Sequence, residues 1–427
     1  MAKKTENVID ELDNLLFGSN TGTEVIKPSE DEGVKNWYSV GNYAINYCMS
    51  KRLRGGVPAG RITAFEGLSG TGKSLLTTGV MKDPNIDMVI IIETEGGGNS
   101  KELLEYMGVP LEKVRIIKAH TFTSYRIDKK TGKREEVADK DVPQKLVTDT
   151  YVYVEGVTKI VKDLLSKISM SKVSKDKKLL IVLDSLANLQ SVRELNGTAD
   201  MGKRAQDIGI FFRCFDNSIE KTNTAFIFTN KLYTNIGNEY DPWKTAGGEN
   251  VIYNPSIIMR TSKTADSSDV TEKDKKEEKE NKTGGVGSNF ETMNAVIRKS
   301  RFGTRGKKCQ FMVETSTGLV KHSGLFKLLN DYGIIERSGG AWYVCPVLFG
   351  DKKFQKTGFL DLFIEKEEEY LDILQAELDK REIEIRQKKL ADIETVTDEA
   401  VERENEIDEA LDFDEASALS ALVNDLE

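Results

Sequence analysis

Residues 67–74 have the types and spacing of a phosphate-binding loop, G-x-x-x-x-G-K-[ST], between a strand-like and a helix-like segment. Glycines in such a loop let backbone N–H groups turn inward around an anion at the positive end of the following helix. Lys73 is expected to reach the β- and γ-phosphates of a nucleoside triphosphate, and the Ser74 hydroxyl is the expected protein ligand of Mg²⁺. The predicted nucleotide site comprises Gly67, Leu68, Ser69, Gly70, Thr71, Gly72, Lys73, Ser74 and Leu75.

Further candidate metal-binding and catalytic residues lie at the ends of predicted strands. Apolar runs at 88–93, 179–184 and 224–230 alternate with helix-like segments, which predicts a parallel sheet covered by helices. Asp184 follows four apolar residues, so it is a candidate Mg²⁺ ligand, although a helix N-cap would also explain it. Glu95 is our choice for the carboxylate that orients or deprotonates the attacking water, with Glu93 as the competitor.

Composition limits the other classes of chemistry. The 427 residues hold no apolar run near the ~20 needed to span a bilayer, and the N-terminus lacks the apolar core of a secretory signal. The four cysteines contain no C-x-x-C pair, which favours a reducing cytoplasm over disulfides or a zinc site. The two histidines are expected to be structural, so acid–base chemistry falls to carboxylates.

Charge is distributed unevenly along the chain. Residues 391–427 contain fourteen Asp and Glu against the single Arg403, so the first 390 residues carry +4 although the whole chain carries -9. This composition predicts a solvated tail. Two roles stay open for it: solubility, or electrostatic competition with polyanions for a basic groove.

Several motifs appear in the order typical of one family. Tyr38-Ser-Val-Gly-Asn-Tyr-Ala-Ile-Asn and Gly56-Val-Pro-Ala-Gly-Arg-Ile62 precede the loop. Glu93-Thr-Glu95, Leu183-Asp-Ser-Leu-Ala-Asn188 and Gly339-Gly-Ala-Trp-Tyr343 follow it. Over residues 38–345 the chain therefore resembles the RecA-type recombinases, and the phage UvsX branch fits best.

The resemblance implies an α/β fold: a RecA-like P-loop ATPase core with a central, mostly parallel sheet flanked by helices. It also implies an N-terminal helical arm (1–35), a core (36–315), a small α/β C-terminal domain (316–390) and the acidic tail (391–427). The implied activity is DNA-dependent hydrolysis of ATP with Mg²⁺ by a helical filament on single-stranded DNA, which pairs that strand with homologous duplex DNA in recombination and repair. The implied partners are both forms of DNA, further copies of the chain, and single-strand-binding or mediator proteins at the C-terminal region; the expected location is the cytoplasm, the host's if the chain is phage-encoded, with no membrane contact.

The resemblance also assigns residues around the nucleotide. Lys299 and Arg301 resemble a basic pair that reaches the ATP of the adjacent subunit. Asn230 and Lys231 stand where the family carries a Gln or His that senses the γ-phosphate, which is a departure. Tyr106 lies three residues beyond the position of the tyrosine that often stacks on adenine.

Two loops beyond the predicted sheet edge are the expected DNA contacts. Lys203 and Arg204 lie in the first (194–206), Arg213 lies about two helical turns further on, and it matches a DNA-contacting arginine of the family. The second loop (231–250) mixes cations with aromatic rings, which suits binding without base readout. Its residues are Lys231, Tyr233, Tyr240, Trp243 and Lys244, with Gly247 and Gly248 closing it by resemblance. The segments 121–150 and 262–289 are expected to be solvated insertions.

Three alternatives remain from the sequence. The second loop could be a surface loop whose rings pack on their neighbours. A ring helicase shares the ATPase core, and a non-catalytic recombinase mediator would bind ATP without turnover.

Overall fold

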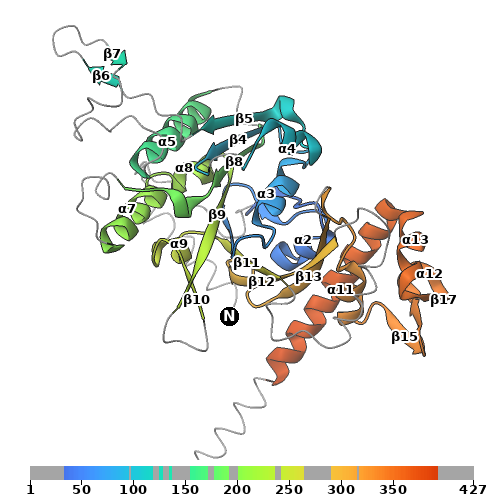
Figure 1. Ribbon diagram of the computed structural model, residues 1–427. Helices are drawn as coiled ribbons and strands as arrows, with labels where there is room; N and C mark the ends of the chain where they lie inside the picture. The colour runs from blue at the N-terminus through green and yellow to red at the C-terminus, as the bar shows by residue number, and fades with distance from the viewer. Residues whose placement is uncertain are drawn as a thin grey trace, which may run out of the picture.

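A ten-stranded sheet forms the centre of the computed structural model, which describes residues 33–95, 98–118, 125–127, 134–136, 154–171, 177–191, 201–235, 242–263, 290–314 and 317–392 (Figure 1). The strands lie in the order β14-β13-β12-β11-β3-β9-β8-β4-β5, and β10 pairs with β9 outside this path. Their bounds are β3 (Ile62–Gly67), β4 (Met88–Glu93), β5 (Val114–Lys118), β8 (Leu179–Asp184), β9 (Ala225–Thr234), β10 (Trp243–Thr245), β11 (Ile257–Lys263), β12 (Phe290–Ser300), β13 (Lys308–Glu314) and β14 (Gly318–Leu319).

Most strands of the sheet run parallel. Strands β11, β3, β9, β8, β4 and β5 pair in parallel, whereas β12, β13 and β14 continue the sheet antiparallel beyond β11. The central strands β4 and β8 are apolar up to their last residue because helices cover both faces of the sheet. The predicted α/β class with a mostly parallel sheet is confirmed.

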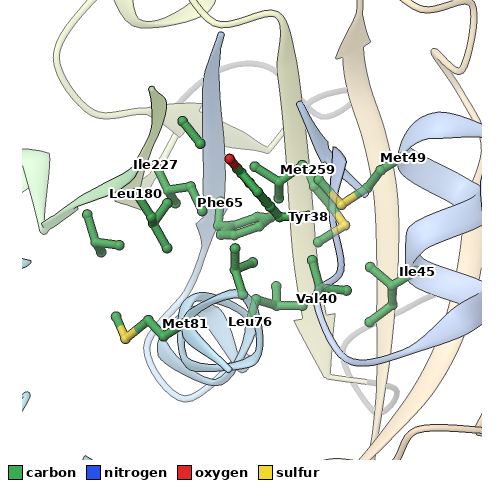
Figure 2. Close-up of a cluster of buried hydrophobic side chains, with 14 of the residues drawn as sticks. Tyr38, Val40, Ile45, Met49, Phe65, Leu76, Met81, Leu180, Ile227 and Met259 are labelled. Atoms are coloured by element: carbon green, nitrogen blue, oxygen red, sulfur yellow. The ribbon is translucent and has the colours of Figure 1, made fainter. Parts of the chain in front are cut away.

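Alternate residues of the strands enter two separate hydrophobic cores. Phe65, Leu180 and Ile227 face a core shared with α2 (Tyr43–Ser50) and α3 (Lys73–Met81), as Figure 2 shows. Their chain neighbours Ala64, Ile181 and Phe226 face the opposite core, which is shared with α5 (Val154–Met170), α7 (Met201–Arg213) and α8 (Asp216–Lys221). The period of two in a strand therefore fixes both helical layers around the sheet.

A third core gathers elements from the C-terminal part of the described chain. It contains side chains of α11 (Leu325–Asp331), β16 (Trp342–Cys345), α12 (Pro346–Phe349), β17 (Gly350–Gln355), α13 (Phe359–Ile364) and a helix over 367–392, together with Tyr43 and Tyr47 of α2. The same part of the chain also contains β15 (Glu336–Gly339) and η6 (Lys356–Gly358). Two turn residues, 365 and 366, separate α13 from the longer helix. Each helix buries its own apolar stripe in this core: Phe359 and Phe363 from α13, and Leu371, Leu374 and Leu378 from the longer helix.

Two carboxylates attach the helix over 367–392 to the body of the protein. Glu367 pairs with Lys321 at 2.9 Å and also bonds Tyr43 of α2. Glu382, four turns further along, pairs with Lys51 at 2.9 Å and also bonds Lys307. Burial acts to raise the pKa of each carboxyl, but these hydrogen bonds hold both pKa values at about 2.

Smaller elements complete the description. They are β1 (Trp37–Tyr38), β2 (Val57–Pro58), α4 (Lys101–Tyr106), η1 (Leu111–Lys113), β6 (Tyr125–Ile127), β7 (Arg134–Glu136), η4 (Leu186–Asn188) and α9 (Asn250–Tyr253). The predicted N-terminal arm, segment 264–289 and the tail beyond residue 392 lie outside the described residues, as does most of 121–150. Residues 262 and 263, expected in an insertion, belong to β11. The division into domains stays a prediction.

Candidate functional site

The phosphate-binding loop joins the end of β3 to the start of α3. Gly70 and Gly72 adopt φ values of +72° and +82°, a region that side chains with a Cβ disfavour. Gly67 is required for a different reason: a Cβ there would lie 2.4 Å from Thr71 Oγ1. Thr71 Oγ1 donates to the Leu68 carbonyl at 2.9 Å and closes the loop. The predicted loop is therefore present as a compact turn at a helix N-terminus.

Lys73 lies folded back against this loop. Its Nζ donates to the carbonyls of Gly67, at 3.1 Å, and of Leu68, at 2.6 Å. Burial lowers the pKa of Lys73, although the charges of Asp184 and Glu95 act in the opposite direction. The ammonium group thus stays beside the loop, within reach of an anion held by the loop amides. Ser74 follows it in the first turn of α3 and is exposed.

Asp184 ends β8 as a buried carboxylate, 6 % exposed. It accepts hydrogen bonds from Thr229 Oγ1 and, at 3.4 Å, from Asn99 Nδ2. The alternative of a helix N-cap is not supported, because Ser185 occupies the N-cap of η4 and neither recorded Asp184 hydrogen bond comes from the backbone of η4. Burial raises the pKa of the Asp184 carboxyl, against the effect of both hydrogen bonds and of Lys73.

The oxygen donors at this edge fit Mg²⁺. A buried carboxylate destabilised by desolvation gains from a nearby cation, and Mg²⁺ binds through one or two protein oxygens plus phosphate and water. Asp184 and the Ser74 hydroxyl are the two candidate ligands. Among the described residues, no cluster of three or more His, Cys, Asp or Glu side chains offers an all-protein metal site.

The two candidate catalytic carboxylates differ in environment. Glu93 is 2 % exposed and accepts the Asn99 N–H at 3.0 Å, so it holds the turn after β4. Glu95 has a side chain 38 % exposed, and it accepts the Ser185 hydroxyl at 2.7 Å. Burial acts to raise the pKa of Glu95, but Ser185 and Lys231 together hold it below its ordinary value. Of the two carboxylates, only Glu95 is open to a substrate.

Lys231 and Asn230 face different surroundings. Lys231 Nζ pairs with Glu95 at 2.9 Å and donates to Asn188 Oδ1 at 3.0 Å, so it joins the carboxylate cluster. Asn230 is fully buried and donates to the Ala246 carbonyl at 2.9 Å. Of the two residues predicted near the γ-phosphate, Lys231 reaches the carboxylate cluster. Asn230 instead binds the chain at Ala246, directly after β10.

The second predicted DNA-binding loop begins as a β-hairpin. Residues 231–234, expected in a loop, continue β9, and 232–234 pair with β10. Tyr233 lies opposite Lys244 in this ladder, and both side chains are exposed on one face. The half-buried Trp243 lies opposite Thr234, whereas Tyr240 lies outside the described residues. The hairpin therefore presents a ring and a cation side by side.

Gly247 and Gly248 follow the hairpin with φ values of +93° and +80°. A Cβ on Gly248 would lie 2.7 Å from the Cβ of Ala205 in α7. The second loop therefore closes directly against the helix that follows the first loop.

Helix α7 carries the predicted cations of the first loop. Arg204 Nη2 donates to the Ala187 carbonyl at 2.6 Å, so its guanidinium supports η4 instead of pointing into solvent. Arg213 is exposed in the last turn of the helix. Lys203 lies in α7, but its side chain is outside the described part of the structure.

Lys299 and Arg301 are not brought to the phosphate loop of their own chain. Lys299 pairs with Ile258 at the amino end of β11, whereas Thr261, near the other end, pairs with Gly67. Lys299 Nζ donates to the Ile252 carbonyl at 2.9 Å, and burial together with the Arg301 charge lowers its pKa to about 8. Tyr106, at the end of α4, is 65 % exposed.

Sequence reasoning missed several side chains of this edge. The Asn99 backbone N–H donates to Glu93, the Ser185 hydroxyl donates to Glu95, and the Thr229 hydroxyl donates to Asp184. The position of Thr229 directly before Asn230, at the end of the predicted apolar run 224–230, was an available signal. Asn99, in a glycine-rich turn, offered none.

Comparison with known proteins gives similarity of low identity. No family model matches the chain. The RecA protein of Phytoplasma mali is 30 % identical over 168 residues, 38 % of this chain and 45 % of that protein, so the chain spans less than half the length of this relative. The RecA proteins of Aquifex aeolicus and Aquifex pyrophilus are 23 % and 22 % identical over 303 residues, 70 % of this chain and 71 % and 70 % of theirs.

The described helices include none that is long and apolar enough to cross a bilayer. At 22–30 % identity, the chain is similar to RecA proteins.

Proposed function

We propose that this chain is an ATP-dependent DNA recombinase, related to the phage UvsX-like branch. It forms filaments on single-stranded DNA, hydrolyses ATP in response to that DNA, and pairs the bound strand with a homologous duplex. The observation that carries the proposal is the contact of Lys231 with Glu95. It joins the candidate hydrolytic carboxylate to the strand that continues into the hairpin.

The proposed hydrolysis divides among residues at one edge of the sheet. The loop amides and Lys73 bind the phosphates, and Glu95 orients the attacking water and accepts its proton. Ser74 and Asp184 would hold Mg²⁺, which neutralises phosphate charge when bound. Lys231 fixes the orientation of Glu95 through their 2.9 Å ion pair.

The proposed DNA contacts use charge and stacking without base readout. Lys244 and Arg213 supply exposed cations for phosphates, and the Tyr233 ring, 54 % exposed, offers a stacking surface. Trp243, Tyr240 and Lys203 belong to the same proposed surface. Base pairing between strands then supplies the sequence recognition.

Assembly completes the proposed site. Lys299 and Arg301 lie away from the loop of their own chain, which fits a role at the nucleotide of the next protomer. There they would stabilise transition-state charge in the manner of an arginine finger. The predicted N-terminal arm (1–35) would dock on a neighbouring copy, and mediator or single-strand-binding proteins would bind the C-terminal region.

ATP hydrolysis with and without single-stranded DNA tests this function. We expect DNA to stimulate the wild type, Lys73→Ala to lose turnover, and Lys244→Ala to keep basal turnover while needing more DNA for stimulation. Lys353, exposed on β17 away from the proposed surface, supplies the control Lys353→Ala. Turnover that ignores DNA, or equal responses of the Lys244 and Lys353 variants, would contradict the proposal.

A further inference from the structure

A second buried carboxylate lies directly before the phosphate loop and takes no part in the proposed hydrolysis. Glu66 is the next-to-last residue of β3 and is 2 % exposed. Its Oε1 accepts Arg260 Nε at 2.7 Å, and its Oε2 accepts Thr245 Oγ1 at 2.8 Å. One carboxylate therefore joins three strands: β3, β11 and β10.

The ion pair with Arg260 alone would offset much of the cost of burying the Glu66 charge. Arg260 lies directly beside Glu66 in the parallel ladder of β11 and β3, and its side chain is 15 % exposed. The contact with Thr245 is different because Thr245 belongs to the hairpin and not to the core strands. It fixes the hairpin by a charge-assisted hydrogen bond, a stronger contact than one between neutral groups.

On one side, the contact leads into the phosphate loop. Glu66 precedes Gly67, whose carbonyl accepts Lys73 Nζ. Thr261, which follows Arg260, donates to Thr71 Oγ1 inside the loop at 3.0 Å. A change in loop conformation on binding phosphate therefore acts on both strands that hold the Glu66 carboxylate.

On the other side, the contact leads into the proposed DNA surface. Thr245 pairs with Leu232 across the hairpin, and both are buried beneath it. Its neighbour Lys244 is exposed on the opposite face, and Ala246 accepts the buried Asn230 side chain. A shift of Thr245 therefore moves the exposed cation next to it.

We propose that Glu66 is a positioning residue that couples the state of the phosphate loop to the hairpin through Thr245. The inference rests on the proposed function and adds a route by which nucleotide sets DNA affinity. This route is separate from the Lys231 contact, because β9 and β8 lie between β3, which carries Glu66, and β4, which precedes Glu95, and because Glu66 bonds a different residue of the hairpin.

The test measures coupling directly, as the ratio of single-stranded DNA affinities with a non-hydrolysable ATP analogue and with ADP. We expect a ratio of about tenfold or more for the wild type, within the usual range of coupling between sites. Thr245→Val keeps the shape but removes the hydroxyl, and should bring the ratio to within about threefold of one. Thr245→Ser keeps the hydroxyl and should retain the wild-type ratio.

Controls separate coupling from stability. Thr234→Val makes the same change at an exposed position of the hairpin and should leave the ratio unchanged. Melting temperature and analogue affinity of Thr245→Val without DNA should match the wild type. By reciprocity, DNA should raise the ratio of analogue affinity to ADP affinity in the wild type by the same factor, and Thr245→Val should lose this effect.

Glu66→Gln is the second variant, because it keeps side-chain size and should reproduce the loss. A full wild-type ratio in folded Thr245→Val, equal losses in Thr245→Val and Thr234→Val, or a wild-type ratio near one would each overturn the inference. The proposed function fails by a different result: a wild type that does not bind single-stranded DNA with either nucleotide.

Discussion

The substitution of Glu95 by Gln, compared with the same substitution two residues earlier, separates catalysis from structure. Both carboxylates end the same strand region, but Glu95 faces the cluster of Lys231 and Ser185, whereas Glu93 is buried against the turn at Asn99. We expect Glu95→Gln to lower ATP turnover by about 10²–10⁴-fold, the usual contribution of a positioned general base.

The free energy of unfolding should respond in the opposite order, with a larger loss in Glu93→Gln than in Glu95→Gln. The Glu95–Lys231 pair has side chains 38 % and 44 % exposed, so its loss costs about 0–1 kcal/mol of unfolding free energy. Glu93→Gln weakens a buried hydrogen bond from a backbone N–H to a charged group, which costs about 1.5–3 kcal/mol. Its turnover, measured below its melting temperature, should stay within about tenfold of the wild type.

Two measurements decide the comparison: steady-state ATP hydrolysis at saturating nucleotide, and urea unfolding monitored by tryptophan fluorescence. Nucleotide affinity should change little in Glu95→Gln, because Lys73 and the loop amides hold the phosphates. The reasoning is refuted if folded Glu93→Gln loses turnover by orders of magnitude while Glu95→Gln retains it.

Three further predictions address other parts of the molecule. Arg204→Ala should lower the melting temperature, because it removes the hydrogen bond to η4. Arg213→Ala should leave the melting temperature unchanged and reduce the salt slope of single-stranded DNA binding by about one. Equal effects of the two variants on stability would contradict this. Gly248→Ala should destabilise the fold by more than about 1 kcal/mol, since its φ is +80° and a Cβ would press on α7, and a variant as stable as the wild type in urea would disprove it. The pKa values of Glu367 and Glu382 fall from 4.5 to about 2 on folding, so their contribution is complete above pH 4.5 and is lost as the pH falls toward 2. Melting temperature across this window should drop less steeply for Glu382→Gln than for the wild type, and parallel curves would argue against it.

The sheet could be predicted because its signal is local. The runs at 88–93 and 179–184 coincide with β4 and β8, since strands buried on both faces must be apolar throughout. The phosphate loop was equally clear, because its glycines are needed for a backbone conformation that other residues disfavour.

The hairpin could not be predicted, because its signal is not local. Residues 232–234 form a strand through pairing with β10, which is separated from them by a further segment of chain. In the sequence Lys231-Leu-Tyr-Thr234, the single aliphatic residue Leu232 is too little to define a strand pattern. Tertiary pairing therefore decided this element over local composition.

The roles of single charged residues were also beyond the sequence. Glu66 is a visible exception in an apolar strand, but its partners lie 194 and 179 positions away. We expected Arg204 to bind DNA because it is a cation in a predicted loop. The structure gives it a carbonyl partner in η4, a contact that no spacing rule specifies.

Strand exchange between circular single-stranded DNA and homologous linear duplex DNA tests the central claim most directly. With ATP and Mg²⁺, the wild type should convert the substrates into joint molecules and nicked circles, while Lys73→Ala and a non-homologous duplex should yield none. If the wild type hydrolyses ATP but forms no joint molecules, or unwinds a forked duplex without homology, the chain is not a recombinase.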